Sequence, residues 1–410
     1  MTARTRAIAA IAYAFAVTMI GTTLPTPLYP IYQSEIGFSA LIVTVVFAAY
    51  GAGVLVALLF IAPLSDRYGR RALLWPGIVL AAASSAVFLL AHGLPLLFVG
   101  RVLSGLSAGM FTGTATAAII ELAPPEKRDR ATLLAAVVNI GGLGVGPILA
   151  GALAQIASDP LRLPYIVHLA LLLPAVAAIT LIPEPDVRPE PQSRPGAGTP
   201  RLGVPRELRP LFIRAGSAAF AAFATLGLFS AVAPSVIHEL LGLSSHVLTG
   251  AVASLVFTAS AIGQLGMGRL HHTPALRLGC GLMIVGMALI AAALALSSLG
   301  LLIAGGIAAG FGNGLSFRAG LSALNEQSPP EQRGAVNSSF FVIAYVAISL
   351  PIVGVGAASQ AIGLRAAGLA FTGCIATLAL AVLLSLSSFR RETPPGTPHT
   401  AATVGSTDSP

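Results

Sequence analysis

The most suggestive polar residues of this sequence lie in a short stretch between residues 62 and 71. Asp66, Gly69, Arg70 and Arg71 follow one another there, between two long apolar segments. An aspartate can pair with an arginine or cap the N-terminus of a helix, and a glycine allows a tight turn. This spacing predicts a short, positively charged connection between two helices, in which the aspartate makes one of these two contacts.

Groups that can carry a proton are scarce, and none of the 15 acidic residues lies near the middle of an apolar segment. Proton-coupled transport normally requires a protonatable carboxylate or histidine along the pathway. Glu121 and Glu326, which lie near the ends of apolar segments, are the nearest candidates. Asp66 and His168 follow them as candidate proton sites.

Two arginines, Arg101 and Arg318, lie inside apolar segments. A buried arginine is costly in a membrane unless it is paired or hydrated, so each is expected to face the interior of a helix bundle. Arg101, Gly105 and Gly109 recur at four-residue spacing and form a narrow stripe that suits contact with another helix. Arg318 has two interpretations: it bonds to backbone carbonyls of a neighbouring helix, or it lines a cavity and disfavours cationic cargo.

Small residues recur at helical spacing between residues 142 and 151. Gly142, Gly146, Pro147 and Gly151 are expected to form a bend and a packing seam, without contacting a substrate. A mostly apolar cavity with few polar groups suits amphipathic cargo. The candidate residues that line such a cavity are Thr22, Thr23, Tyr50, Asn139, Phe229, Asn313, Arg318 and Tyr345.

The composition places all of these residues in a membrane protein. Of the 410 residues, 55% are hydrophobic and 9% are charged, whereas a typical soluble domain carries about 25% charged residues. The mean hydropathy is +0.87. This excludes a soluble enzyme, a nucleic-acid-binding module and a secreted disulfide scaffold. Cys280 and Cys374 lie in apolar runs and are expected to be small apolar fillers.

Twelve apolar stretches are long enough to cross a bilayer, because a spanning helix needs about 20 residues. They predict an all-α polytopic membrane protein, with twelve transmembrane helices in two pseudo-symmetric six-helix bundles. The predicted spans are 7–29, 39–61, 72–92, 94–121, 131–156, 163–182, 211–236, 247–268, 277–298, 299–326, 335–359 and 366–388.

The basic residues set the orientation of these spans. With the N-terminus inside, 19 of the 23 basic residues fall in cytoplasmic segments, and only Arg162 and Arg365 fall on the other side. The net charge of +8 therefore reflects topology, and a nucleic-acid partner is not expected. Both termini are predicted to be cytoplasmic. Because Lys127 is the single lysine, a bias typical of GC-rich bacterial genomes, we expect the inner membrane.

An internal repeat divides the chain. A gap-free shift of 205 residues aligns 13 identical residues within 56 positions, including an uncommon E-x-x-P-P-E-x-R loop that starts at Glu121 and again at Glu326. Two such halves are related by an axis along the membrane normal, which places a substrate site between them. The predicted domains are an N-terminal bundle (1–182), a cytoplasmic linker (183–210), a C-terminal bundle (211–388) and a disordered cytoplasmic tail (389–410).

Together, the loop, the arginine-glycine stripe and the seam resemble the signature motifs of the major facilitator superfamily. The Gly146-Pro147 pair resembles the signature of its twelve-span drug:proton antiporter branch. The resemblance implies alternating access, with Asp66 and Arg70 locking the two halves. It also implies that the loop arginine meets an acid at the inner end of the fourth span, a place that Glu121 occupies here.

The sequence departs from the family pattern at several positions. Ala62 and Ala150 replace family glycines, and Ser104 stands where a glutamine is common. The second-half copy of the loop motif, residues 266–272, has lost its aspartate.

These observations predict a secondary transporter that exports a neutral or anionic amphipathic compound in exchange for protons. The sequence contains no Walker loop for ATP, and no cluster of acids or histidines within the spans that would support an enzyme or a metal site. We expect no cofactor, a monomer in the lipid bilayer, and a small-molecule substrate and protons as partners. The alternatives are a sugar or metabolite permease and, in a different class, a non-transporting scaffold or receptor.

Overall fold

A computed structural model describes residues 3–180, 202–266, 270–329 and 331–388, and every regular element among them is helical. Most of the predicted linker (183–210) and the predicted tail (389–410) lie outside the described residues. Residues 267–269 of the second loop motif lie outside them as well.

Within the described residues, twelve helices are long and apolar enough to cross a membrane, which confirms the predicted number. The first six spans contain α1 (Ala3–Thr23), α2 (Tyr29–Ile36), α3 (Ala40–Val56), α4 (Ser65–Tyr68), α5 (Arg70–Leu89), α6 (Leu94–Leu122), α7 (Arg128–Ile156) and α8 (Leu163–Thr180). The last six contain α9 (Arg209–Gly227), α10 (Ala233–Ser235), α11 (His246–Gly266), α12 (His272–Leu296), α13 (Leu299–Gln327), α14 (Arg333–Ile362) and α15 (Leu364–Ser388).

The first span is longer than predicted, because a proline-rich turn continues it. We predicted its end at residue 29, but a 3₁₀ turn at Thr26–Leu28 joins α1 to α2, and the span ends at Ile36. Pro27 and Pro30 each lie in the first turn of a helical segment, where the missing N–H group costs no hydrogen bond. Prolines at these positions therefore bend the span without ending it.

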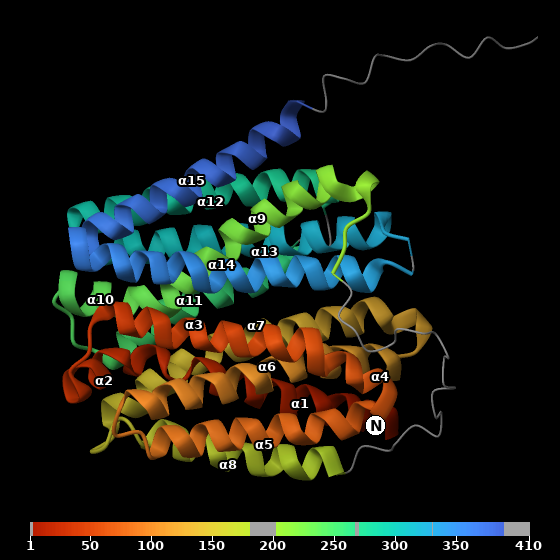
Figure 1. Cartoon of the computed structure of the whole chain (residues 1–410), viewed down its shortest axis with the longest axis horizontal. Coiled ribbons are helices and arrows are strands. Elements are labelled where there is room, and N and C mark those ends of the chain that lie inside the picture. Colours follow the sequence, from red (N-terminus) through yellow and green to blue (C-terminus); the bar gives the residue numbers. More distant parts are fainter. Residues whose placement is uncertain (1–2, 181–201, 267–269, 330, 389–410) are drawn as a thin grey trace, which may run out of the picture.

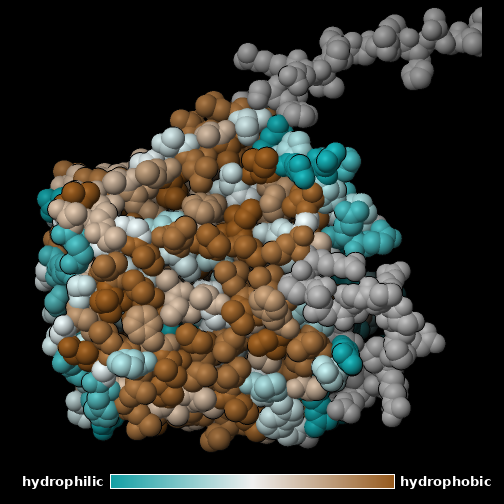
Figure 2. All heavy atoms as spheres, viewed as in Figure 1, coloured by the Kyte–Doolittle hydropathy of each residue, from teal (hydrophilic) through white to brown (hydrophobic). Residues whose placement is uncertain are grey.

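The two groups of six spans form two bundles that lie side by side (Figure 1). A broad belt of the visible surface is hydrophobic, and hydrophilic residues gather at its two ends (Figure 2). This distribution is that of a protein whose middle lies in the apolar core of a bilayer. We call the end that carries Arg70 and Arg206 the linker end, and the opposite end the far end.

The structure reproduces the internal repeat. Helices α6 and α13 each contain 29 residues and begin 205 residues apart. A Cβ atom on Gly105 would overlap the carbonyl oxygen of Tyr50 on α3, and one on the equivalent Gly310 would overlap that of Val256 on α11. Gly109 likewise lies against α3. The glycines therefore let α6 and α13 pack directly on the backbone of a neighbouring helix.

The two bundles meet where α7 packs against α11 and α3 packs against α14. At the far end the backbones of α7 and α11 touch at Gly151 and Gly250, and Oε1 of Gln155 accepts a hydrogen bond of 3.0 Å from the N–H group of His246. Toward the linker end a small pocket of about 40 Å³ lies between the end of the second span and α14. The seam between α7 and α11 is closed at the far end. The pocket is lined by Leu55, Leu58, Leu59, Ser338, Phe341 and Val342.

Candidate functional site

Arg70, at the start of α5, pairs with Glu121, near the end of α6. Nη2 of Arg70 lies 2.7 Å from Oε1 of Glu121, and Nε lies 3.1 Å from Oε2, so the contact is bidentate. The guanidinium also donates to the hydroxyl of Ser65. Gly69 has a φ of 93°, a conformation that favours glycine, and it turns the chain from α4 into α5. The side chain of Asp66 lies outside the described part of the structure.

The second bundle carries the equivalent contact with different chemistry. Oε1 of Glu326, the repeat of Glu121, lies 2.8 Å from Nε2 of His272. His272 is the first residue of α12, as Arg70 is of α5, so a histidine stands where the first bundle has an arginine. A shift of 205 residues does not align these two positions, and the sequence repeat alone therefore does not reveal His272. Arg71 follows Arg70 on α5 and is half-buried.

Arg101, on α6, is buried to 1% exposure. Its Nη1 donates to the carbonyl oxygen of Thr22 at 2.6 Å, and its Nε donates to the hydroxyl of Tyr29 at 2.8 Å. Its Cζ lies 5.2, 5.7 and 5.9 Å from the ring centroids of Tyr29, Phe47 and Tyr50. Helices α1, α2 and α3 therefore hold the charge between oxygen atoms and aromatic faces.

No carboxylate among the described residues pairs with Arg101. Hydrogen bonds and aromatic rings stabilise its charge instead, and the charge stays unneutralised in the apolar interior. Cζ of Arg101 lies 5.9 Å from the ring centroid of Tyr50, a residue of the large buried core to which both bundles contribute.

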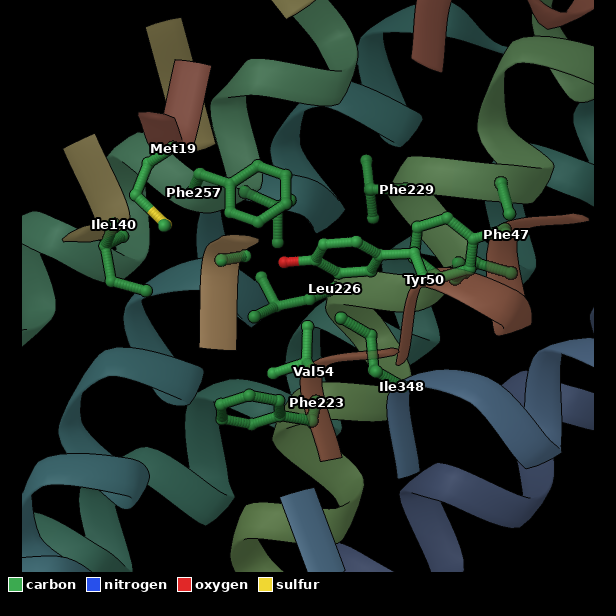
Figure 3. Close-up of a cluster of buried hydrophobic side chains, with 14 of the residues drawn as sticks. Met19, Phe47, Tyr50, Val54, Ile140, Phe223, Leu226, Phe229, Phe257 and Ile348 are labelled. Atoms are coloured by element: carbon green, nitrogen blue, oxygen red, sulfur yellow. The ribbon is translucent and has the colours of Figure 1, made fainter. Parts of the chain in front are cut away.

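A set of buried side chains, which we call the central cluster, fills the space between the bundles (Figure 3). Tyr50, Phe229 and Tyr345, all predicted to line a cavity, belong to the same buried core. The ring centroids of Tyr345 and Phe223 are 6.1 Å apart, and the side chain of Tyr345 lies close to Thr112 in the other bundle. The central cluster comprises Met19, Phe47, Tyr50, Val54, Ile140, Phe223, Leu226, Phe229, Phe257 and Ile348.

The four small residues of α7 divide between two neighbouring helices. Gly142 and Gly146 lie against α1, and Gly151 lies against α11. Pro147 lies within α7, and its carbonyl group packs against Gly250 of α11. The motif therefore has the geometry of a packing seam, with one side toward its own bundle and the other toward the second bundle.

The remaining candidate cavity residues are held within single bundles. Arg318 donates to a backbone carbonyl group of α11, which is the first of its two interpretations. Oδ1 of Asn313 accepts a hydrogen bond of 2.7 Å from the hydroxyl of Ser260. The hydroxyl of Thr23 donates to the backbone of α7, and Asn139 is half-buried on that helix.

Metal chemistry has no support in the described residues, where no three His, Cys, Asp or Glu side chains converge on a common point. Cys280 and Cys374 are both free thiols.

Comparison with curated proteins gives partial matches to drug-resistance proteins. Quinolone resistance protein NorA of Staphylococcus aureus is 27% identical over 168 residues, which cover 40% of this chain and 42% of that protein. Multidrug resistance protein 1 of Bacillus subtilis is 27% identical over 202 residues, which cover 48% of this chain and 49% of that protein. The chain thus matches less than half the length of these relatives.

Solved structures match over nearly the whole chain at low identity. A bacterial homologue of the human lysosomal transporter Spinster, in an inward-facing and unoccupied conformation, superposes with a TM-score of 0.77 and 18% identity. The match covers 97% of this chain and 100% of that one. The human organic anion transporter MFSD10 superposes with a TM-score of 0.65 and 17% identity, over 94% of this chain and 100% of that one. These similarities show the fold.

The sequence profile of the Major Facilitator Superfamily matches residues 11–350. That range includes most of both six-helix bundles, the charged loop before α5, Arg101 and the glycine seam of α7. With twelve apolar helices and two repeated bundles in the described residues, the chain belongs to the Major Facilitator Superfamily of transporters.

Proposed function

We propose that this transporter exports small amphipathic compounds that are neutral or anionic, and that protons moving in the opposite direction drive the export. The observation that carries the proposal is the unneutralised charge of Arg101, whose Cζ lies 5.9 Å from the ring centroid of Tyr50 in the central cluster. The names of two matched relatives, which concern quinolone and multidrug resistance, support the same kind of cargo.

The central cluster offers cargo an aromatic and aliphatic surface with few polar groups. Apolar sites with a few placed hydroxyl groups suit amphipathic small molecules, and Tyr50 and Tyr345 supply such hydroxyl groups here. Cζ of Arg101 lies only 5.9 Å from the ring centroid of Tyr50. In surroundings of low dielectric constant, this charge would repel a cation bound on the other side of the ring. A neutral or anionic cargo is not repelled by this charge.

The conformation supports alternating access. The arginine-rich linker end is the predicted cytoplasmic end, and a small pocket lies there on the boundary between the bundles, next to α14. Export requires the far-end seam to separate. The backbone contact between Gly151 and Gly250 involves no side chains, so the seam can separate there without breaking an ion pair.

Growth of an efflux-deficient bacterium that expresses the protein tests this function. The wild type is expected to protect against norfloxacin, a quinolone that is neutral overall as a zwitterion, and to leave sensitivity to the dication pentamidine unchanged. A protonophore is expected to stop norfloxacin export from preloaded cells. Asp66→Asn should remove the protection, and Asp159→Asn, which alters an exposed far-end pair with Arg162, should retain it.

Three results would contradict the proposal. Protection against pentamidine would refute the cargo class, and export that survives the protonophore would refute proton coupling. Net uptake of norfloxacin would favour a permease.

Reversing the Arg70–Glu121 pair tests whether this contact supports transport. Arg70→Glu is expected to lower norfloxacin export about tenfold, because two carboxylates would then face each other. The double variant Arg70→Glu/Glu121→Arg should recover most of the export, as measured in a double-mutant cycle. Both side chains are partly exposed, so the free energy of unfolding should change by less than about 1 kcal/mol.

Reversal of the Asp159–Arg162 pair is the matched control, and it should leave export unchanged. The contact has no role in transport if the double variant exports no better than Arg70→Glu alone.

A further inference from the structure

A small polar chamber lies inside the first bundle, between α1, α5, α6 and α8. Its volume is about 10 Å³, about the space that one water molecule needs. His168 of α8 lines this chamber and is 1% exposed. The hydroxyl groups that line it belong to Thr18, Thr22, Ser84, Ser85, Ser104 and Ser107.

The hydrogen bonds of His168 fit a neutral imidazole. Nε2 lies 3.0 Å from the carbonyl oxygen of Val17, and because a carbonyl oxygen only accepts, Nε2 carries the hydrogen. Nδ1 lies 2.7 Å from Oγ of Ser85, and in the neutral ring the hydroxyl donates to the lone pair of Nδ1. Gly21 makes room for the ring, since a Cβ atom there would overlap it. In this conformation Nδ1 is therefore free of a proton and faces a group that can also accept one.

The chamber is rich in hydrogen-bond acceptors. Ser84 donates to the carbonyl oxygen of Gly100 at 2.8 Å, and Ser107 donates to that of Gly77 at 2.6 Å. Because backbone carbonyl groups consume these hydroxyl protons, the lone pairs of the two oxygens stay available to the chamber. Such surroundings suit a water molecule that donates hydrogen bonds.

The second bundle shows that the fold does not require this polarity. Gly100 packs against Phe88, and Gly305 packs against Ile290 in the same way, which aligns α5 with α12 and α6 with α13. At the aligned positions the second bundle has no hydroxyl group, and glycine there packs directly on the neighbouring backbone. Ser84, Ser85, Ser104 and Ser107 correspond to Gly286, Met287, Ala309 and Gly312.

The titratable neighbours of the chamber come from three of the helices around it, α1, α6 and α8. Arg101 of α6 reaches its edge through the carbonyl group of Thr22, and the hydroxyl of Tyr13 on α1 donates to α8. Tyr165, one turn before His168, bonds to a tyrosine of α2. No carboxylate lines the chamber among the described residues. Among the groups that line the chamber, His168 is thus the one with a ring nitrogen that can accept a proton.

A polar route connects the chamber to the central cluster. Thr22 lines the chamber, and the hydroxyl of Tyr50 lies close to its side chain. A proton that leaves His168 therefore has hydroxyl groups along its way to the space between the bundles.

We propose that His168 is the residue that carries the coupled proton, and that the chamber holds the water molecule that exchanges it. In loading, this water donates a proton to Nδ1 and leaves as hydroxide, or arrives as hydronium and leaves as water. The hydroxyl of Ser85 turns to accept from Nδ1–H. In release, the proton returns to water and passes Thr22 and Tyr50. The inference rests on the proposed proton coupling, and the neutral imidazole seen here is the state after release.

Transport by the purified, reconstituted protein tests this role of His168. The wild type should accumulate norfloxacin in vesicles with an acidic interior, and it should exchange labelled for unlabelled norfloxacin at equal pH on both sides. His168→Gln should keep the exchange but lose accumulation by about tenfold, because exchange needs no net proton movement. A glutamine amide can still donate to Val17 and accept from Ser85, so this variant is expected to fold.

His92→Gln, which alters an exposed histidine outside the chamber, is the matched control and should keep both activities. Full pH-driven accumulation by His168→Gln would overturn the proposal, as would loss of both activities in a folded protein. Accumulation that follows a Na⁺ gradient in the wild type would assign the chamber to that cation instead and refute it. If the wild type exchanges norfloxacin but does not accumulate it in response to the pH gradient, transport is not coupled to protons. That result would refute both the proposed proton coupling and the role of His168.

Discussion

Gly151→Val is expected to abolish export, because it prevents the far end of the molecule from closing. A Cβ atom at this position would overlap the carbonyl oxygen of His246, and the backbone of Gly250 lies beside it. Overpacking of a tight contact costs about 1–3 kcal/mol, and each 1.4 kcal/mol shifts an equilibrium tenfold. The variant should therefore populate the state with an open far end about 10- to 100-fold more than the wild type.

Thiol labelling measures this shift directly. Ser254 of α11 donates to the carbonyl oxygen of Gly144 at 2.5 Å in the closed seam. In a Cys280→Ser/Cys374→Ser background, Ser254→Cys should react with a membrane-impermeant maleimide much faster when Gly151→Val is present. Gly141→Val is the control, since a Cβ atom at Gly141 meets no atom within 4 Å. Equal labelling rates with and without Gly151→Val would show that the seam does not govern closure.

Arg101→Met is expected to let the transporter export the lipophilic cation ethidium, which the wild type should exclude. The substitution removes the charge behind Tyr50 and keeps an unbranched side chain of similar length. Loss of the hydrogen bond to Tyr29 should destabilise the folded protein by about 1–3 kcal/mol. The substitution also removes a buried charge, and the desolvation cost that this saves offsets the loss. Folding should therefore be preserved, and ethidium efflux should rise at least about tenfold above that of the wild type.

Arg101→Lys separates charge from shape in this experiment. The lysine retains the positive charge but not the planar, multiply bonded guanidinium, so it should still exclude ethidium. Efflux of ethidium by Arg101→Lys, or continued exclusion of ethidium by a folded Arg101→Met, would show that the charge of Arg101 does not exclude cationic cargo.

The spans and the repeat are predictable because their signals are local in the chain. The predicted span 94–121 and helix Leu94–Leu122 differ by one residue, and the shift of 205 residues appears again in the starts of α6 and α13. The predicted end of the first span at residue 29 was wrong by seven residues, because the chain continues through Pro27 and Pro30 to Ile36. Whether a proline ends a helix depends on its place in the turn, which composition does not specify.

The partners of the charged residues could not be predicted in the same way. Helical periodicity gives the face on which Arg101 lies, but Thr22 and Tyr29 approach it from other helices. The repeat is no guide here, because the position equivalent to Arg101 is Gly306, where the ring of Phe229 fills the space. The sequence left two interpretations of Arg318 open, and only the packing of α11 against α13 shows its carbonyl partner.

The polar chamber around His168 was even harder to predict from the sequence. Its four serines are spread over α5 and α6 at spacings that no motif describes, and single serines in apolar helices are common packing residues. The sequence offered His168 as a candidate proton site, but it did not indicate that Ser85 and Val17 hold the ring. The comparison between the two bundles, once α5 and α12 are aligned, sets this polar group apart from ordinary packing.

Glu121 and Glu326, which are equivalent in the repeat, have basic partners of different kinds at the linker end. A guanidinium keeps its charge throughout the physiological range, whereas the imidazole of His272 holds Glu326 electrostatically only while it is protonated. The first bundle therefore fastens its acid with a permanent ion pair, whereas the equivalent acid of the second bundle depends on the charge of a histidine.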